Sequence, residues 1–236
     1  MDISTSKLYQ HLYGARLVSK LYGEEYGGRK NTLVRQTNDK RRAYVAVSGT
    51  QRMSHWLNNM NVALNDKGVH SGFKSFADGC YMEIMDELSK SSEVDLDRIE
   101  SMTFVSHSLG AGALIVLLYE ELLRNSNGEF GFGKDLGRMD VDVVMLGAPK
   151  CGSTDFSKHF NFLIKNYPNI KMYRYMIEND FVTEFPPISQ YAHVCEGIPM
   201  YEQKRRMNIF YNHSLNNYIM NFKRMIEKSK NNKPQH

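Results

Sequence analysis

The sequence contains few cysteines: Cys80, Cys151 and Cys195 are the only ones among 236 residues. Their number is odd and their spacings are long, so they predict neither a disulfide framework nor a CxxC metal site. We interpret them as free thiols in a reducing compartment. Because no basic segment followed by an apolar stretch opens the chain, we expect a cytoplasmic protein, although a chain already stripped of a signal would look the same.

Long apolar runs and a large net charge are also missing. No stretch of 18 or more apolar residues occurs, so no membrane-spanning helix is expected. The net charge of +4 is too small to indicate nucleic-acid binding. Basic residues do cluster at 40–42, at 204–206 and in the tail from 223 to 233. Such clusters are usually solvated faces, but they can also favour peripheral contact with an anionic lipid surface.

What the sequence does contain is an alternation of strand and helix patterns. Strands alternating with helices predict an α/β fold with a mostly parallel central sheet and helices on both faces. The chain length suits a single domain over residues 1–228, followed by a polar tail, 229–236, that we expect to be disordered. The expected strands are 32–37, 43–48, 102–106, 141–146 and 171–177, and the expected helices are 4–22, 71–90, 109–124 and 214–226.

The strongest functional signal is a serine between a strand and an apolar helix. Ser108 follows Phe104-Val105-Ser106-His107 and precedes Leu109-Gly110-Ala111-Gly112. This is the context of a G-x-S-x-G nucleophile elbow, in which the residues two before and two after the serine must be small. Serine replaces the first glycine here, at Ser106. At the start of the following helix, backbone N–H groups and the helix dipole stabilise a developing oxyanion. A plain tight turn without chemistry is the alternative.

A serine nucleophile needs a histidine base and a carboxylate that orients it, in the chain order Ser, Asp or Glu, His. Asp180 follows a predicted strand, whereas Asp142 lies inside one and Asp155 follows an earlier one, so Asp180 is favoured. His213 lies just before the last predicted helix, the usual place for the base. The alternative base, His193, falls in a segment that resembles a strand.

Six short blocks, in order along the chain, resemble the class 3 lipase family, which includes fungal triacylglycerol lipases and related plant acyl hydrolases. The resemblance runs from about Ala43 to Tyr218. Each block is weak alone, but the ordered set is specific. The blocks are Val47-Ser48-Gly49-Thr50, Val69-His70-Ser71-Gly72-Phe73, Ser106 to Ala113, Gly147-Ala148-Pro149-Lys150-Cys151-Gly152, Arg174 to Pro187, and Tyr191-Ala192-His193.

The resemblance implies an α/β-hydrolase fold and a role for each matching residue. Ser108 would be the nucleophile, Asp180 the acid and His213 the base. Thr50 would bind the oxyanion through its backbone N–H and hydroxyl, and Leu109 through its backbone N–H. The expected reaction is acyl transfer from a lipid ester, a lipase or esterase activity that needs no metal or cofactor; no metal-ligand spacing is visible in the sequence.

The chain also departs from the family pattern. Serine stands at 48 where the family has arginine, serine at 106 where it has glycine, and Thr183 where it often has proline. The missing arginine is expected to loosen the strand end that holds Thr50. His193 matches a recurrent histidine of the family that is not catalytic, which agrees with the choice of His213.

A lid is expected directly after Thr50. Four apolar residues recur there with the period of an amphipathic helix, and they include the only tryptophan of the chain: Met53, Trp56, Leu57 and Met60. In the resembled family this position holds an interfacial lid; a helix packed permanently on the core is the alternative. The sequence leaves three functions open: acylglycerol lipase, phospholipase A1, galactolipase or soluble-ester esterase with the same triad, and a non-catalytic lipase-like binding module.

Overall fold

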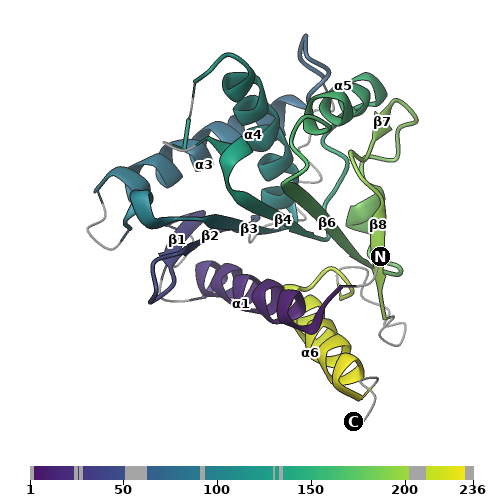
Figure 1. Cartoon of the computed structure of the whole chain (residues 1–236). Helices are drawn as coiled ribbons and strands as arrows, with labels where there is room; N and C mark the ends of the chain where they lie inside the picture. Colours follow the sequence, from purple (N-terminus) through teal and green to yellow (C-terminus); the bar gives the residue numbers. More distant parts are fainter. Residues whose placement is uncertain are drawn as a thin grey trace.

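The computed structural model describes residues 3–23, 26, 29–50, 63–90, 94–129, 131–132, 135–201 and 211–231. A six-stranded sheet forms its centre (Figure 1). In spatial order the strands are β1 (Thr32–Gln36), β2 (Arg42–Val47), β3 (Ser101–His107), β4 (Asp140–Leu146), β6 (Ile170–Ile177) and β8 (Gly197–Met200).

Most of this sheet is parallel. β1 pairs with β2 in the antiparallel sense, and every other neighbouring pair is parallel. Every residue of β3 is buried, and so is every residue of β4 after its first. Such continuous apolar strands are typical of a sheet covered on both faces. The predicted α/β fold is therefore confirmed, and the carboxyl ends of β2, β3, β4 and β6 meet at one edge.

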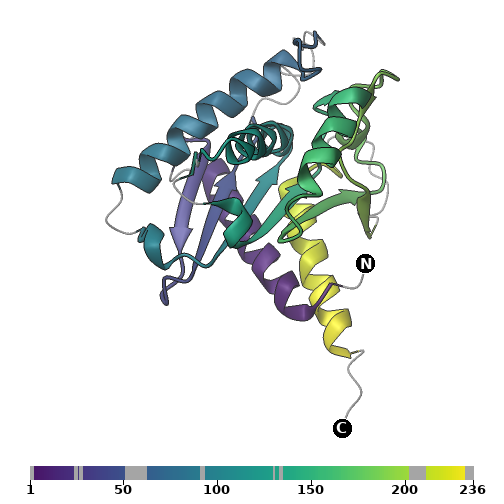
Figure 2. The same cartoon turned by 45° about the horizontal axis from the view of Figure 1, so that its top comes forward.

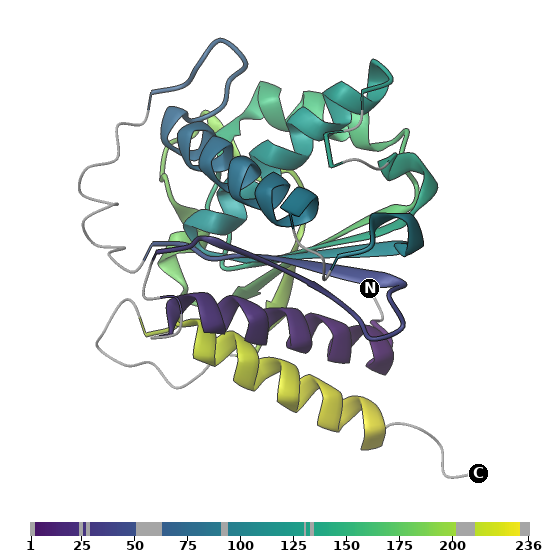
Figure 3. The same ribbon diagram turned by 90° about the vertical axis from the view of Figure 1, so that its left-hand side faces the viewer.

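Helices cover the two faces of the sheet and enclose two separate hydrophobic cores (Figures 2 and 3). On one face, α1 (Thr5–Tyr22) packs beside α6 (Leu215–Asn231). The other face carries α3 (Ser71–Lys90), α4 (Leu109–Ser126) and α5 (Thr154–Ile164). α4 is the central helix, and its first eleven residues are all buried. Among the described helices, none is both long and apolar enough to cross a membrane.

The long elements fall within a few residues of their predicted bounds, whereas several short ones were not predicted. These are α5, the two-stranded ribbon of β5 (Gly152–Ser153) and β7 (Tyr191–Ala192), β8, and the 3-10 turns η1 (Leu96–Arg98), η2 (Leu136–Arg138) and η3 (Phe181–Glu184). Helix α6 continues to Asn231, past the predicted domain boundary at residue 228. His193 directly follows β7 instead of lying within it.

The outer edge of β1 is covered by carboxylates of α3. The N–H of Thr32 donates to Glu83 over 2.9 Å, and the N–H of Val34 donates to Glu87 over 2.8 Å. Unpaired N–H groups on an edge strand invite pairing with another chain. The two glutamates satisfy these groups and join the antiparallel strand to the helical layer.

Candidate active site

Ser108 lies in the tight turn between β3 and α4. Its backbone angles are φ 61° and ψ −129°, a region that side-chain-bearing residues rarely adopt. A Cβ on Gly110 would lie 2.4 Å from the carbonyl oxygen of Ser48, so a larger residue cannot occupy this position. Ser106 is buried, and its hydroxyl donates to the carbonyl of Val144 in β4 over 3.3 Å. This bond explains how serine replaces the usual glycine at the elbow.

The end of β2 passes directly against Ser108. A Cβ on Gly49 would lie 2.9 Å from Cβ of Ser108, which brings the backbone leading to Thr50 beside the serine. Leu109 is the first residue of α4, ahead of the first helical N–H groups that bond to the Ser108 carbonyl. The N–H of Leu109 thus belongs to the helix end where no intrahelical acceptor exists, as an oxyanion donor requires.

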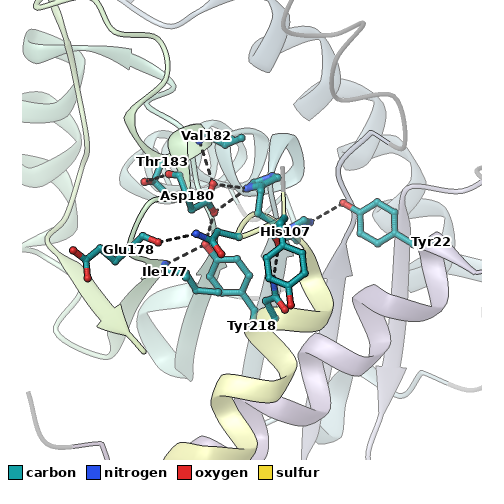
Figure 4. A network of polar contacts seen from close by, with 12 residues as sticks. Tyr22, His107, Ile177, Glu178, Asp180, Val182, Thr183 and Tyr218 are labelled. Carbon is teal, nitrogen blue, oxygen red and sulfur yellow. Dashed lines mark hydrogen bonds and ion pairs between the residues drawn. The ribbon is translucent and has the colours of Figure 1, made fainter. Parts of the chain in front are cut away.

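Asp180 and His213 are paired at the same edge of the sheet (Figure 4). Asp180 follows the end of β6 and caps η3 by accepting from the N–H of Val182 over 3.1 Å. Nδ1 of His213 lies 2.9 Å from each carboxylate oxygen. Both side chains are buried, and the hydroxyl of Tyr218 in α6 also donates to Asp180, over 2.5 Å. With Nδ1 donating to Asp180, Nε2 of His213 is the nitrogen that can accept a proton.

His107, the residue before Ser108, links the elbow to His213. The two imidazole rings stack with centroids 4.8 Å apart, and Nε2 of His107 lies 2.9 Å from the carbonyl oxygen of His213. Because a carbonyl only accepts, this assigns the proton to Nε2 of His107 and leaves Nδ1 as an acceptor. The Tyr22 hydroxyl donates to that Nδ1 over 3.0 Å and accepts from the N–H of Gly49 over 2.7 Å.

Hydrogen bonds thus connect three parts of the site: the strand end before Thr50, the elbow and His213. Figure 4 shows the bond between Tyr22 and His107. Burial, with a smaller effect from His213, holds the pKa of His107 well below its ordinary value, so the ring stays neutral and keeps its fixed tautomer. Sequence reasoning missed Tyr22, His107 and Tyr218. The position of His107 next to Ser108 could have marked it as a site residue. Nothing in the sequence marks Tyr22 or Tyr218 in this way.

The alternative residues have other partners. Asp142 lies in β4 and forms an ion pair with Lys7 of α1, on the face away from α4. Asp155 is highly exposed in the first turn of α5 and pairs with Lys158. Nε2 of His193 donates a hydrogen bond to the carbonyl of Thr183 over 2.7 Å, so this histidine stabilises the turn that follows Asp180. Burial, and to a lesser degree Arg174, lowers the pKa of His193 to about 4. The lid residues Met53, Trp56, Leu57 and Met60 lie outside the described residues.

A strained serine at a strand–helix elbow, followed along the chain by a buried Asp–His pair, is the arrangement of the α/β-hydrolase class of serine hydrolases. The sequence model of the class 3 lipase family matches residues 44–190, so the chain belongs to this family, whose reaction is the hydrolysis of lipid esters.

Known relatives agree with this assignment. Phospholipase A1-II 4 of Oryza sativa subsp. japonica is 26% identical over 185 residues, which cover 68% of this chain and 44% of the relative. Phospholipase A1-II 1 of Oryza sativa subsp. indica is 24% identical over 172 residues, covering 63% and 40%. The chain therefore spans less than half the length of these curated relatives.

Solved structures share the fold. The Rhizomucor miehei lipase in its propeptide complex superposes with a TM-score of 0.59 at 15% identity, covering 85% of this chain and 69% of that one. The Yarrowia lipolytica LIP2 lipase gives a TM-score of 0.57 at 16% identity, covering 84% and 81%.

Proposed function

We propose that this chain hydrolyses acyl esters of lipids, acylglycerols in particular, by a serine mechanism. Ser108 is the nucleophile, His213 the base and Asp180 the acid that orients it, while the backbone N–H groups of Thr50 and Leu109 hold the oxyanion. The observation that carries the proposal is the buried Asp180–His213 pair, in which Nδ1 of the histidine lies 2.9 Å from each carboxylate oxygen. The ring of His213 stacks on that of His107, the residue before the strained Ser108.

The reaction proceeds in two acyl transfers. Nε2 of His213 takes the proton from the Ser108 hydroxyl as its oxygen attacks the ester carbonyl carbon, and the carbonyl oxygen becomes the oxyanion. The imidazolium then protonates the departing alkoxide, leaving an acyl-enzyme and a free alcohol. Water, deprotonated by the same nitrogen, attacks the acyl-enzyme and releases the fatty acid and the serine. The carboxylate of Asp180 stabilises the imidazolium.

Phospholipids are the second candidate substrate class. The matched plant relatives carry the name phospholipase A1, which favours a phospholipid acyl ester over a galactolipid or a soluble ester. Galactolipids and soluble esters would use the same groups, and a non-catalytic binding module would not need the Asp180–His213 pair. Head-group choice depends on the shape and charge of the pocket around the serine, which the fold class leaves undetermined.

Labelling by a fluorophosphonate ester tests the nucleophile. Wild-type protein should label and should hydrolyse p-nitrophenyl butyrate, and Ser108→Ala should lose both while remaining folded. His213→Ala should also lose turnover, whereas His193→Ala should retain it; the opposite pattern would move the base to His193. Release of fatty acid from trioctanoin, compared with release from the two acyl positions of phosphatidylcholine, then separates lipase from phospholipase A1. Folded wild type that neither labels nor turns over any ester would favour the binding module.

Two further parts of the proposal concern location. We infer that the protein makes peripheral contact with lipid surfaces, because its ester substrates are gathered there. We also infer a cytoplasmic location, supported by the odd number and long spacing of the three cysteines. The lid over residues 51–60 stays a prediction.

A further inference from the structure

The positive charge of the chain is concentrated in one layer of the fold. Helices α1 and α6 together contain seven basic residues and one acidic residue, Glu227. The rest of the chain contains 23 basic and 25 acidic residues, so the helix pair carries +6 and everything else carries −2. Lys7 is neutralised by Asp142. The other six cations are all exposed: Arg16, Lys20, Lys223, Arg224, Lys228 and Lys230.

These cations share their face with exposed tyrosines. Tyr9 and Tyr13 are 46% and 45% exposed, and with Arg16 and Lys20 they form one stripe along α1 at the spacing of helical turns. The ammonium of Lys230 lies 5.4 Å from the centroid of the Tyr9 ring, so this stripe adjoins the basic end of α6. Figure 3 shows α1 and α6 side by side below the sheet, with no other described element on their outer side.

We propose that the outer face of α1 and α6 is a docking surface for anionic phospholipid bilayers. Lysine and arginine are attracted by the negative potential of such a surface, and the effect adds over several residues. Tyrosine prefers the polar–apolar boundary of a bilayer, with its ring among the lipid chains and its hydroxyl at the head groups. A nucleic-acid duplex would match the charge, but its bases are already stacked, so it offers no apolar boundary for the half-exposed phenol rings of α1 or for Met220 of α6, which is 43% exposed.

This surface is distinct from the site around Ser108. The docking proposal rests on the proposed function, because binding to a bilayer serves an enzyme whose substrates are lipids. α6 begins beside His213 and runs away from the site, while Tyr22, the last residue of α1, reaches His107. Docking through the two helices holds the enzyme on the phase that contains its substrate without using any group of the Ser108 site. The surface therefore governs the apparent KM for vesicle lipid and leaves the hydrolysis of soluble esters unchanged.

Vesicle sedimentation with the full chain tests the surface. Phosphatidylcholine vesicles containing 30 mol% phosphatidylserine, a fraction chosen to be roughly that of an anionic leaflet, are compared with pure phosphatidylcholine. A triple variant, Lys20→Gln with Lys223→Gln and Lys230→Gln, removes three cations from the face. The matched control, Lys158→Gln with Lys165→Gln and Lys171→Gln, removes three exposed cations: one from α5, one from the residue that follows it and one from the start of β6.

At roughly five-fold per cation, the triple variant should lose on the order of 100-fold in partition coefficient on anionic vesicles. The control should lose little, and high salt should abolish the difference. Equal binding of wild type to both vesicle types, or equal loss in both variants, would overturn the proposal, as would binding to a DNA duplex but not to vesicles. Hydrolysis of p-nitrophenyl butyrate in the same samples reports the catalytic proposal separately, because it needs no lipid surface.

Discussion

Asp180 accepts hydrogen bonds from three groups, and each comes from a different segment: Val182 in the following turn, His213, and Tyr218 in α6. Gly147 completes its surroundings. This glycine has φ +60°, and a Cβ there would lie 2.9 Å from Asp180 Oδ2 and 3.0 Å from the ring of His213. Asp180 and His213 are therefore packed against bare backbone, which blocks rotation of the carboxylate toward Gly147 and leaves its hydrogen bonds, including the one from Tyr218, to hold it in the other directions.

Tyr218→Phe should lower kcat by about tenfold and leave KM nearly unchanged. The variant removes a charge-assisted bond to a buried carboxylate, a loss of about 1.5–3 kcal/mol, and frees Asp180 to reorient. The control is Tyr175→Phe, which removes a buried hydroxyl that bonds His11 on the same side of the sheet and makes no bond to Asp180 or His213. Steady-state hydrolysis of p-nitrophenyl butyrate and urea unfolding should show similar stability losses but a kcat defect in Tyr218→Phe alone.

Single residues differ in how far the sequence could predict them. Ser108 follows β3 directly, Asp180 lies in the loop after β6, and His213 precedes α6, so their positions along the chain were enough to predict them. Tyr22 could not be found in this way, because its contact with His107 joins a helix end to a strand end only after the sheet has formed. Amphipathic spacing of α1 marks its buried side but does not distinguish a packing tyrosine from one that bonds an imidazole.

At the scale of elements, the contact between α3 and β1 affects the strand end that leads to Thr50, the proposed oxyanion residue. Glu83 accepts from the backbone N–H and side-chain amide of Asn31, at 2.8 and 3.0 Å, besides its bonds to Thr32. The Asn31 carbonyl in turn accepts from the N–H of Ser48, over 2.9 Å, and from its hydroxyl, over 3.3 Å. These bonds hold the end of β2 although arginine is missing at position 48. They therefore oppose the loosening of this strand end that the sequence led us to expect.

Glu83→Gln should therefore reduce kcat by about tenfold with little change in KM. The amide oxygen of glutamine can replace Oε2, but its NH2 then faces the side-chain amide of Asn31, and the three bonds at Oε2 lose the negative charge that strengthens them, so the strand end before Thr50 shifts. Glu87→Gln is the matched control, because its amide oxygen can still accept from Val34 and only the ion pair with Lys30 is lost. Equal kcat values for the two variants would show that Glu83 stabilises the edge strand without positioning the oxyanion loop.

Helices and strands whose apolar residues recur with a clear period were predicted well, whereas elements that exist only through pairing between distant strands were not. α3 occupies its predicted range of 71–90, and the central strands extend only one residue beyond theirs. β5 and β7 have two residues each and exist only because they pair with each other, so no local pattern specifies them. α5 was detectable, since Phe156, Phe160 and Leu163 recur with helical spacing and Ser153 caps its first turn over 3.1 Å.

At the scale of the whole molecule, burial of neutral histidines couples stability to pH. Burial, with smaller effects from Lys7 and Arg42, lowers the pKa of His11 to about 3, and the pKa of His193 is lowered to about 4. Below about pH 6.5 the unfolded chain binds protons at these residues and the native chain does not. Their contribution is fully present above that pH and is lost as the pH falls toward 4.

His11→Gln should make the protein less sensitive to acid. Between pH 6 and pH 4 the free energy of unfolding of the wild type should fall with a slope steeper by up to about 1.4 kcal/mol per pH unit than that of the variant. Urea unfolding at pH 7, 6, 5 and 4 measures both slopes. Parallel curves for wild type and variant would mean that His11 takes up a proton in the native state.

The pairing of α1 with α6 also has a consequence for biosynthesis. The ribosome delivers α1 before the strands of the sheet and α6 after them, so the apolar side of α1 and one face of the sheet have no complete cover until α6 emerges. His213 enters with that helix, long after Ser108. A nascent chain thus carries Ser108 without His213, and under the proposed mechanism its catalytic triad is complete only when α6 packs beside α1.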